Sequence, residues 1–322
     1  MACRPRLPNA SLVLLVVACA AAPAAVAAGC AGTLATGGSS PGASAAPAHA
    51  SPRPTPSPGP PIAVLASPPV RLRAPPLGQP IIAPRSLAVP ILRYHVLGDP
   101  PPGEPDPYRY LPTKVFVRQM RYLVAHGYQA VTLQQVYDFW HGRGSLPARP
   151  IVLSFDDGYF SDFATAAPLL KSLHWPGVLN VLVRPSDPYG PPPLLQAGGA
   201  RPDSPLPEAC IRALIRAGWE IDAHSLTHPD LRRVSASRLV SELAAARAIL
   251  RRLYHVPVNF FCYPRGLYDK AVIAAVRRAG YLGATTTDRG LAVPRELYRL
   301  KRIGVARGEG LRGFAASLLR AW

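Results

Sequence analysis

No aspartate or glutamate occurs before Asp99 in this chain of 322 residues. Cysteine is also scarce, because only Cys210 and Cys262 lie beyond residue 30. That number excludes a disulfide framework and allows at most one bridge. No internal repeat is found, which excludes a solenoid or other repeat architecture. The absence of acidic residues before Asp99 distinguishes the amino-terminal third from the rest of the chain, which has an ordinary globular composition.

Lysine is nearly absent, with 4 lysines against 32 arginines, and the formal net charge is +18. A charge of this size raises the question of nucleic-acid binding. However, no cluster of basic residues interleaves with aromatic residues that could stack on bases. We therefore expect no nucleic-acid partner. The positive charge is compatible with an anionic neighbour such as a cell-wall polymer.

Residues 1–30 have the features of an export signal. "MACRPR" supplies positive charge and residues 11–28 supply an apolar stretch. Pro23 and many small residues argue against a permanent membrane helix. "AAGC" places Cys30 as in a lipoprotein signal, although Ala27 stands where leucine is usual, so simple cleavage after Ala-x-Ala is the alternative. Either route predicts an exported protein at the cell envelope or outside the cell, with membrane contact only through a lipid anchor at Cys30.

Residues 31–85 consist mainly of Ala, Ser, Pro and Gly. Such a composition buries too little apolar surface to offset the entropy of ordering, which predicts a disordered linker. Residues 86–322 are expected to form a single catalytic domain. Strand-type and helix-type segments alternate there, and the predicted strands are 88–96, 128–133, 150–155, 176–183, 219–225, 257–263, 281–287 and 298–305. Seven or so such units indicate an α/β fold, a (β/α)-barrel rather than an open sheet.

Polar residues gather where the predicted strands end, as in "SFDDG" (154–158) and "HSLTH" (224–228). The carboxyl ends of barrel strands carry the chemistry in folds of this kind. Asp156 and Asp157 are adjacent on one strand and point to opposite sides, so they have different tasks. His224 and His228 can converge if the segment curls into a helical turn. Two imidazoles and one carboxylate form the three-ligand set of catalytic zinc.

The motifs "SFDDG", "HSLTH" and "YPRG", in this order, resemble the polysaccharide deacetylases of the NodB-homology type (carbohydrate esterase family 4). The resemblance covers about residues 88–305. It implies a distorted barrel, usually of seven units. It also implies that Asp156 is the general base and that Asp157, His224 and His228 bind one divalent metal ion. Zinc suits these ligands, and cobalt, nickel or manganese are compatible.

Two departures from the family pattern concern the remaining catalytic groups. Cys262 stands where the family has an arginine that supports the base, and Arg265 stands where tyrosine is common. The backbone N–H of Arg265 can still help to hold the oxyanion. No late histidine follows, but a permuted subgroup, the exported poly-N-acetylglucosamine deacetylases, carries the acid on its first strand. His95 fits that place, and a packed histidine at a strand end is the alternative interpretation.

The predicted function is metal-dependent removal of N-acetyl groups from an N-acetylglucosamine-containing cell-surface polysaccharide. The alternatives are an O-acetyl esterase acting on xylan or another polymer, and a non-catalytic glycan-binding protein on the same fold. The long insertion 184–205 is expected to form a wall of the sugar groove. Aromatic residues that could stack on sugars or belong to the core are Tyr94, Trp175, Tyr189 and Trp219.

Overall fold

The computed structural model describes residues 84–183, 201–305 and 307–319. The expected signal, Cys30, the linker up to residue 83 and residues 184–200 of the insertion lie outside these ranges. Ten strands are found in the described residues: β1 (Ile91–Tyr94), β2 (Val96–Leu97), β3 (Tyr110–Leu111), β4 (Gln129–Ala130), β5 (Pro150–Asp157), β6 (Val178–Val181), β7 (Glu220–Ala223), β8 (Phe260–Cys262), β9 (Gly283–Arg289) and β10 (Leu300–Gly304).

Eight α-helices alternate with these strands in the described residues. They are α1 (Thr113–Ala125), α2 (Leu133–Trp140), α3 (Ala167–Ser172), α4 (Glu208–Arg216), α5 (Ala236–Val240), α6 (Ala246–Tyr254), α7 (Lys270–Arg278) and α8 (Leu311–Leu319). Local sequence defines several helix starts. The side chains of Thr132, Ser235 and Asp269 accept a backbone N–H from the first turn of α2, α5 and α7, respectively. No helix in the described ranges is long and apolar enough to cross a membrane.

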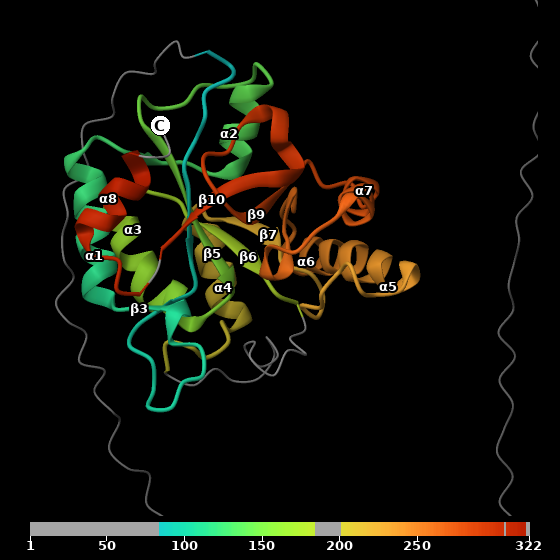
Figure 1. Ribbon diagram of the computed structural model, residues 1–322, viewed down its shortest axis with the longest axis horizontal. Coiled ribbons are helices and arrows are strands. Elements are labelled where there is room, and N and C mark those ends of the chain that lie inside the picture. The colour runs from blue at the N-terminus through green and yellow to red at the C-terminus, as the bar shows by residue number, and fades with distance from the viewer. Residues whose placement is uncertain (1–83, 184–200, 306, 320–322) are drawn as a thin grey trace, which may run out of the picture. The chain divides into compact units, whose positions relative to one another are not determined.

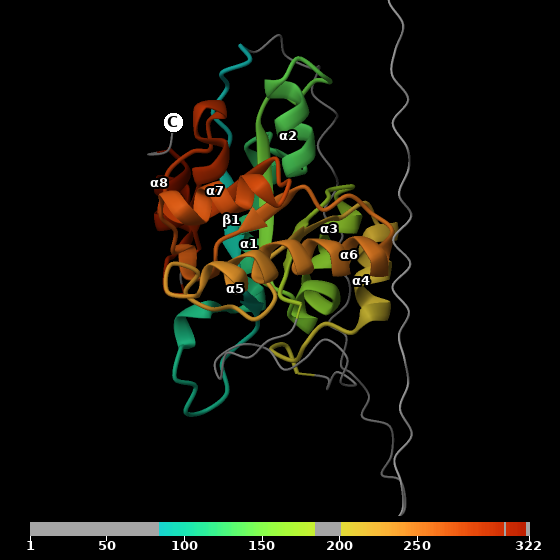
Figure 2. The same ribbon diagram turned by 90° about the vertical axis from the view of Figure 1, so that its right-hand side faces the viewer.

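Seven parallel strands close into a barrel. Their order is β1, β10, β9, β8, β7, β6 and β5, and pairing of β5 with β1 completes the ring. The short strand β4 adds to the start of β5 outside the ring. Helices surround the strands, as Figures 1 and 2 show from two sides. The predicted seven-unit (β/α)-barrel is therefore confirmed.

The interior of the barrel has an apolar layer below a polar layer. Ile91, Val152, Val178, Phe260 and Leu300 come from five strands and form one cluster with apolar residues of α2. Helix α2 therefore closes the end of the barrel at which the strands begin. Side chains two positions further along a strand point the same way. The corresponding residues are mostly polar: Arg93, Ser154, Asn180, Cys262 and Arg302.

This polar layer lies directly beneath the carboxyl ends of the strands. Strand register aligns Asp156 with Asn180, and Asn180 with Asp222. Each of these three side chains is almost completely buried. Because buried polar groups require partners, these side chains must form specific hydrogen bonds and ion pairs near the strand ends.

Candidate functional site

A cleft of about 780 Å³ opens at the carboxyl ends of the barrel strands. Its walls include every site residue predicted from the sequence: His95, Asp156, Asp157, His224, His228 and Arg265. These residues come from four separate strand ends, so the closure of the barrel brings them together. Cys210 and Cys262, the two cysteines in the described residues, are both free thiols.

The two adjacent acids end β5 and face the same cleft. Residues in a regular strand would point to opposite sides, but Asp157 has a left-handed backbone with a φ of 77°. A non-glycine residue in this conformation is held there at some cost by its surroundings. Because of the turn at Asp157, the carboxylates of both acids face the same cleft but lie at different positions in it.

Asp157, His224 and His228 form a cluster whose potential ligand atoms lie within 4.8 Å of one another. Asp157 Oδ1 is 3.4 Å from His224 Nε2 and 4.0 Å from His228 Nε2. His224 Nδ1 lies 2.8 Å from the carbonyl oxygen of Cys262. Because a carbonyl only accepts, Nδ1 carries the proton and Nε2 is left to coordinate, the arrangement usual for metal-binding histidines.

The electrostatics of this cluster favour a cation. Burial opposes the ionised form of Asp157, but the hydrogen bond and charge of His224 hold the pKa of Asp157 well below its usual range. Burial likewise opposes a charged His224, yet Cys262 and Asp157 raise its pKa well above the usual value, so a bound metal ion would take the place of a proton on Nε2. An anionic oxygen between two imidazoles thus attracts positive charge, and the donor set fits a zinc-type ion.

The convergence of the two histidines has a different cause from the one expected. Residues 224–228 form a bend, and Ser225 and His228 have left-handed φ values of 68° and 58°. The predicted helical turn is therefore wrong. The ring centroids still approach to 4.9 Å, so a sharply bent loop achieves what a helical turn would have achieved.

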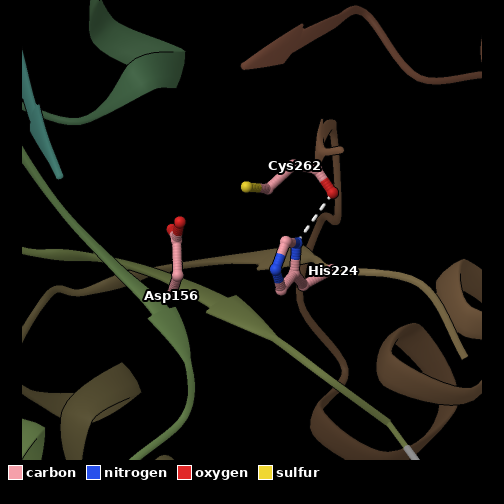
Figure 3. Close-up of side chains that lie close together, drawn as sticks. All are labelled: Asp156, His224 and Cys262. Atoms are coloured by element: carbon pink, nitrogen blue, oxygen red, sulfur yellow. Dashed lines mark hydrogen bonds between the residues drawn. The ribbon is translucent and has the colours of Figure 1, made fainter. Parts of the chain in front are cut away.

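A second cluster contains Asp156, His224 and Cys262, which converge from three strands in Figure 3. A guanidinium group already occupies it. Arg302 Nη1 and Nη2 donate to the two carboxylate oxygens of Asp156 at 2.7 and 2.8 Å, and Nη2 lies 3.2 Å from Cys262 Sγ. A fixed cation in contact with both groups disfavours a metal ion there. The set with Asp157 and His228 is therefore the better metal candidate.

Arg302 on β10 lines the cleft and was not predicted from the sequence. Its remaining donors are also satisfied, because Nε donates to Thr286 O at 2.7 Å and Nη1 lies 3.2 Å from Ser154 Oγ. It thus supplies a buried, bidentate partner for Asp156, although the position expected for an arginine holds Cys262. The available signal was a charged residue at a buried position of a predicted strand.

Asp156 is held in its ionised form. Burial alone would raise its pKa, but Arg302 and the neighbouring imidazoles keep that pKa well below the usual range. Asn180 Nδ2 also donates to Asp156 Oδ1 at 2.7 Å. A carboxylate with this environment is charged at neutral pH and fixed in one orientation.

His95 and Arg265 lie at the edges of the same cleft. His95 Nε2 is 4.0 Å from Asp156 Oδ2, and its side chain is 27% exposed. Burial lowers the pKa of His95, against the opposing effect of both aspartates. Arg265 has a left-handed φ of 55° in the short turn that follows β8. At the next residue, Gly266, an added Cβ would lie 2.0 Å from Thr287 Oγ1, so this turn requires glycine.

Among the aromatic candidates, Tyr94, Trp175 and Trp219 are buried and belong to the core. Tyr189 lies outside the described residues. Tyr108 was not expected, yet it lines the cleft and is 73% exposed. Its place at the cleft depends on tertiary structure, because the fold brings the segment after β2 to the cleft.

Comparisons with known proteins agree with this geometry. Residues 143–284 match the family model described as polysaccharide deacetylase. YxkH of Bacillus subtilis (strain 168), whose name assigns it to the polysaccharide deacetylases, is 23% identical over 229 residues, which cover 71% of this chain and 75% of that protein. The poly-beta-1,6-N-acetyl-D-glucosamine N-deacetylase of Escherichia coli (strain K12) is 36% identical over 66 residues, 20% of this chain and 10% of that protein.

Solved structures share the fold. The deacetylase PplD of Streptococcus pyogenes, in complex with acetate, aligns with a TM-score of 0.63 and 21% identity, covering 72% of this chain and 98% of that one. IcaB from Ammonifex degensii aligns with a TM-score of 0.58 and 20% identity, covering 71% and 96%. Taken with the barrel and its strand-end motifs, these matches show that residues 143–284 form part of a polysaccharide deacetylase domain.

Proposed function

We propose that this protein is a metal-dependent hydrolase that removes N-acetyl groups from an N-acetylglucosamine-containing polysaccharide of the cell surface. The proposal rests on one observation: a fixed carboxylate and a cluster of metal-ligand side chains lie in the same open cleft. Asp156 is a charged carboxylate fixed by Arg302, and Asp157 lies beside His224 and His228. Hydrolysis of an amide requires both a base and electrophilic assistance, whereas sugar binding alone requires neither.

Asp157, His224 and His228 are the residues that would hold the ion. A divalent metal supplies Lewis acidity toward the acetyl carbonyl and makes water more acidic. Asp156 accepts the proton from the attacking water, because its carboxylate is ionised and held in one orientation by Arg302. Since Arg302 donates to both oxygens of the Asp156 carboxylate, the base keeps its orientation during the reaction.

The other two groups act on the substrate. The backbone N–H of Arg265 is assigned to the developing oxyanion, where a fixed donor costs no reorganisation. His95 is assigned as the acid that protonates the leaving amine, since it lies 4.0 Å from Asp156 on the same cleft. Its place after the first barrel strand supports membership of the permuted subgroup. The short match to the Escherichia coli poly-beta-1,6-N-acetyl-D-glucosamine N-deacetylase supports the same substrate class.

Tyr108 is proposed as a platform for a sugar ring. An aromatic side chain that is 73% exposed at the wall of the cleft offers a flat face to the C–H groups of a pyranose. For the placement of the enzyme, we propose that residues 1–30 direct export and that Cys30 carries a lipid anchor. The catalytic domain, proposed for residues 86–322, would then reach surface polymers through a linker of residues 31–85.

The experiment is a measurement of acetate released by the purified chain, loaded with Zn²⁺, from four kinds of substrate. These are poly-N-acetylglucosamine, chitin oligomers, peptidoglycan and acetyl-xylan. Release from N-acetylated polymers is expected. Release from acetyl-xylan alone would assign the chain to O-acetyl esterases, and binding of a glycan without any release would assign it a non-catalytic role.

A further inference from the structure

A buried carboxylate outside the cleft faces the loop that joins the two histidines. Glu242 lies in a π-helical turn, Ser241–Ala245, that connects α5 with α6. Its exposure is 2%, and it is not among the residues that line the cleft. A charged side chain in such a place requires donors, and π-helical turns often occur near functional sites.

The donors come mainly from the loop between His224 and His228. Glu242 Oε2 accepts the backbone N–H of Leu226 at 3.1 Å and that of Thr227 at 2.8 Å. Glu242 Oε1 accepts the hydroxyl of Thr227 and lies 3.5 Å from Arg238 Nε. Hydrogen bonds to an ionised acceptor are stronger than those between neutral groups. Three of these contacts therefore fasten two consecutive residues that precede His228.

The loop needs this support because its own backbone supplies little. Ser225 and His228 are both in left-handed conformations, which non-glycine residues keep only when their surroundings hold them. Within the loop, the N–H of His228 donates to Ser225 Oγ at 2.9 Å. The backbone N–H groups of Leu226 and Thr227 have their acceptor outside the loop, in Glu242 Oε2.

We propose that Glu242 is a positioning residue that presents His228 to the metal site through the backbone of Leu226 and Thr227. The inference rests on the proposed function, since it requires the ion to be held by Asp157, His224 and His228. Of these three ligands, His224 directly follows a barrel strand and Asp157 ends one. His228 alone sits at the end of an irregular loop, so its position depends most on what holds that loop.

Loss of this support would weaken metal binding in a specific way. Without the carboxylate, the metal-free loop samples several conformations, and an ion must select the one that places His228 correctly. Removal of outer contacts that orient metal ligands typically lowers affinity by about 10-fold to 100-fold. A role limited to packing would instead lower the thermal stability of the metal-free and metal-loaded protein by the same amount.

The test is calorimetric titration of Zn²⁺ into the metal-free full chain, with melting temperatures measured before and after loading. Four proteins are compared: the wild type, Glu242→Gln, His228→Ala and Glu208→Gln. Glutamine offers only one accepting group, so it cannot receive all the loop donors. Glu208 pairs with Arg212 four residues away, as Glu242 pairs with Arg238, and does not line the cleft. Glu208→Gln is thus a matched control.

Glu242→Gln is expected to bind Zn²⁺ at least about 10-fold more weakly than the wild type and to gain less melting temperature on loading. Glu208→Gln should match the wild type. Wild-type affinity in Glu242→Gln overturns the inference, as does a melting loss that is equal with and without Zn²⁺. Unchanged affinity in His228→Ala would instead refute the metal site of the proposed function.

If Glu242→Gln does not fold, Thr227→Val replaces it. This variant removes the hydroxyl that donates to Glu242 Oε1 and leaves the carboxylate in place. Its affinity for Zn²⁺ is expected to fall about fivefold, the worth of one hydrogen bond. Wild-type affinity in Thr227→Val would then overturn the inference.

Discussion

Replacement of Arg302 by leucine tests whether a buried ion pair supports the proposed base. The side chains of Arg302 and Asp156 are 1% and 3% exposed, so the variant leaves a buried carboxylate without its bidentate partner. Loss of one partner of a buried pair costs about 3–5 kcal/mol. In a domain of this size, ~1 kcal/mol changes the melting temperature by about 2–4 °C, so Arg302→Leu should melt roughly 6–20 °C lower.

The assay is a double-mutant cycle followed by thermal unfolding. In an Asp156→Asn background the carboxylate is already neutral, so Arg302→Leu should cost much less there than in the wild type. Acetate release should fall by roughly 10²-fold in Arg302→Leu, because a freed base no longer keeps its orientation. Equal melting losses in both backgrounds would mean that the ion pair with Arg302 does not stabilise the Asp156 carboxylate.

A second arm of this experiment asks whether the place of the arginine matters. Cys262 Sγ lies 3.2 Å from Arg302 Nη2, so the two positions approach the same point beside Asp156. Adding Cys262→Arg to Arg302→Leu returns a guanidinium to the strand on which the family pattern has it. Partial recovery of acetate release is expected, and Cys262→Leu in the same background serves as the control.

Three further predictions concern the acid, the barrel interior and the amino terminus. His95→Ala should slow amide hydrolysis by roughly 10² to 10⁴ and should slow hydrolysis of an activated aryl ester much less. The acid must be protonated to act, and burial lowers the pKa of His95. Wild-type activity should therefore fall as pH rises through that lowered pKa, and the variant should not show this fall. Equal deficits on both substrates would make His95 structural. Burial raises the pKa of Glu220 above its usual value and that of Asp222 to about 7, so the folded chain keeps a proton that the unfolded chain releases. Stability should therefore decline as pH rises from about 4 through about 7. Asp222→Asn should flatten that decline in melting curves, and an unchanged slope would contradict it. Cys30→Ser should move the protein from detergent-extracted membranes to the soluble exported fraction, whereas a wild type found wholly in the medium would indicate simple signal cleavage.

Much of the barrel could be predicted because its strands are short apolar runs separated by amphipathic helices. The cleft could be placed for a related reason, since parallel strands in a closed barrel bring their carboxyl ends to one rim. Asp156, His224 and their neighbours were therefore found from their position at strand ends. The family resemblance added roles that periodicity alone does not carry.

The residues that were not predicted have roles that depend on elements distant from them in the sequence. Arg302 pairs with Asp156 across 146 positions of sequence, and no local pattern encodes that contact. The bend at 224–228 depends on Glu242, whose helix packs against the loop after folding. Tyr108 becomes part of the cleft only through tertiary structure. Side-chain partnership between distant elements was the missing information in each case.

The two neighbouring aspartates are proposed to have different roles, Asp156 as the base and Asp157 as a metal ligand, and two variants separate these roles. Metal content and acetate release are measured together in Asp156→Asn and His228→Ala, each prepared in the presence of Zn²⁺. Asp156→Asn is expected to keep about one ion per chain without turnover, whereas His228→Ala should lose most of its metal and its activity. Equal metal loss in the two variants, or turnover in Asp156→Asn comparable with the wild type, would contradict these roles.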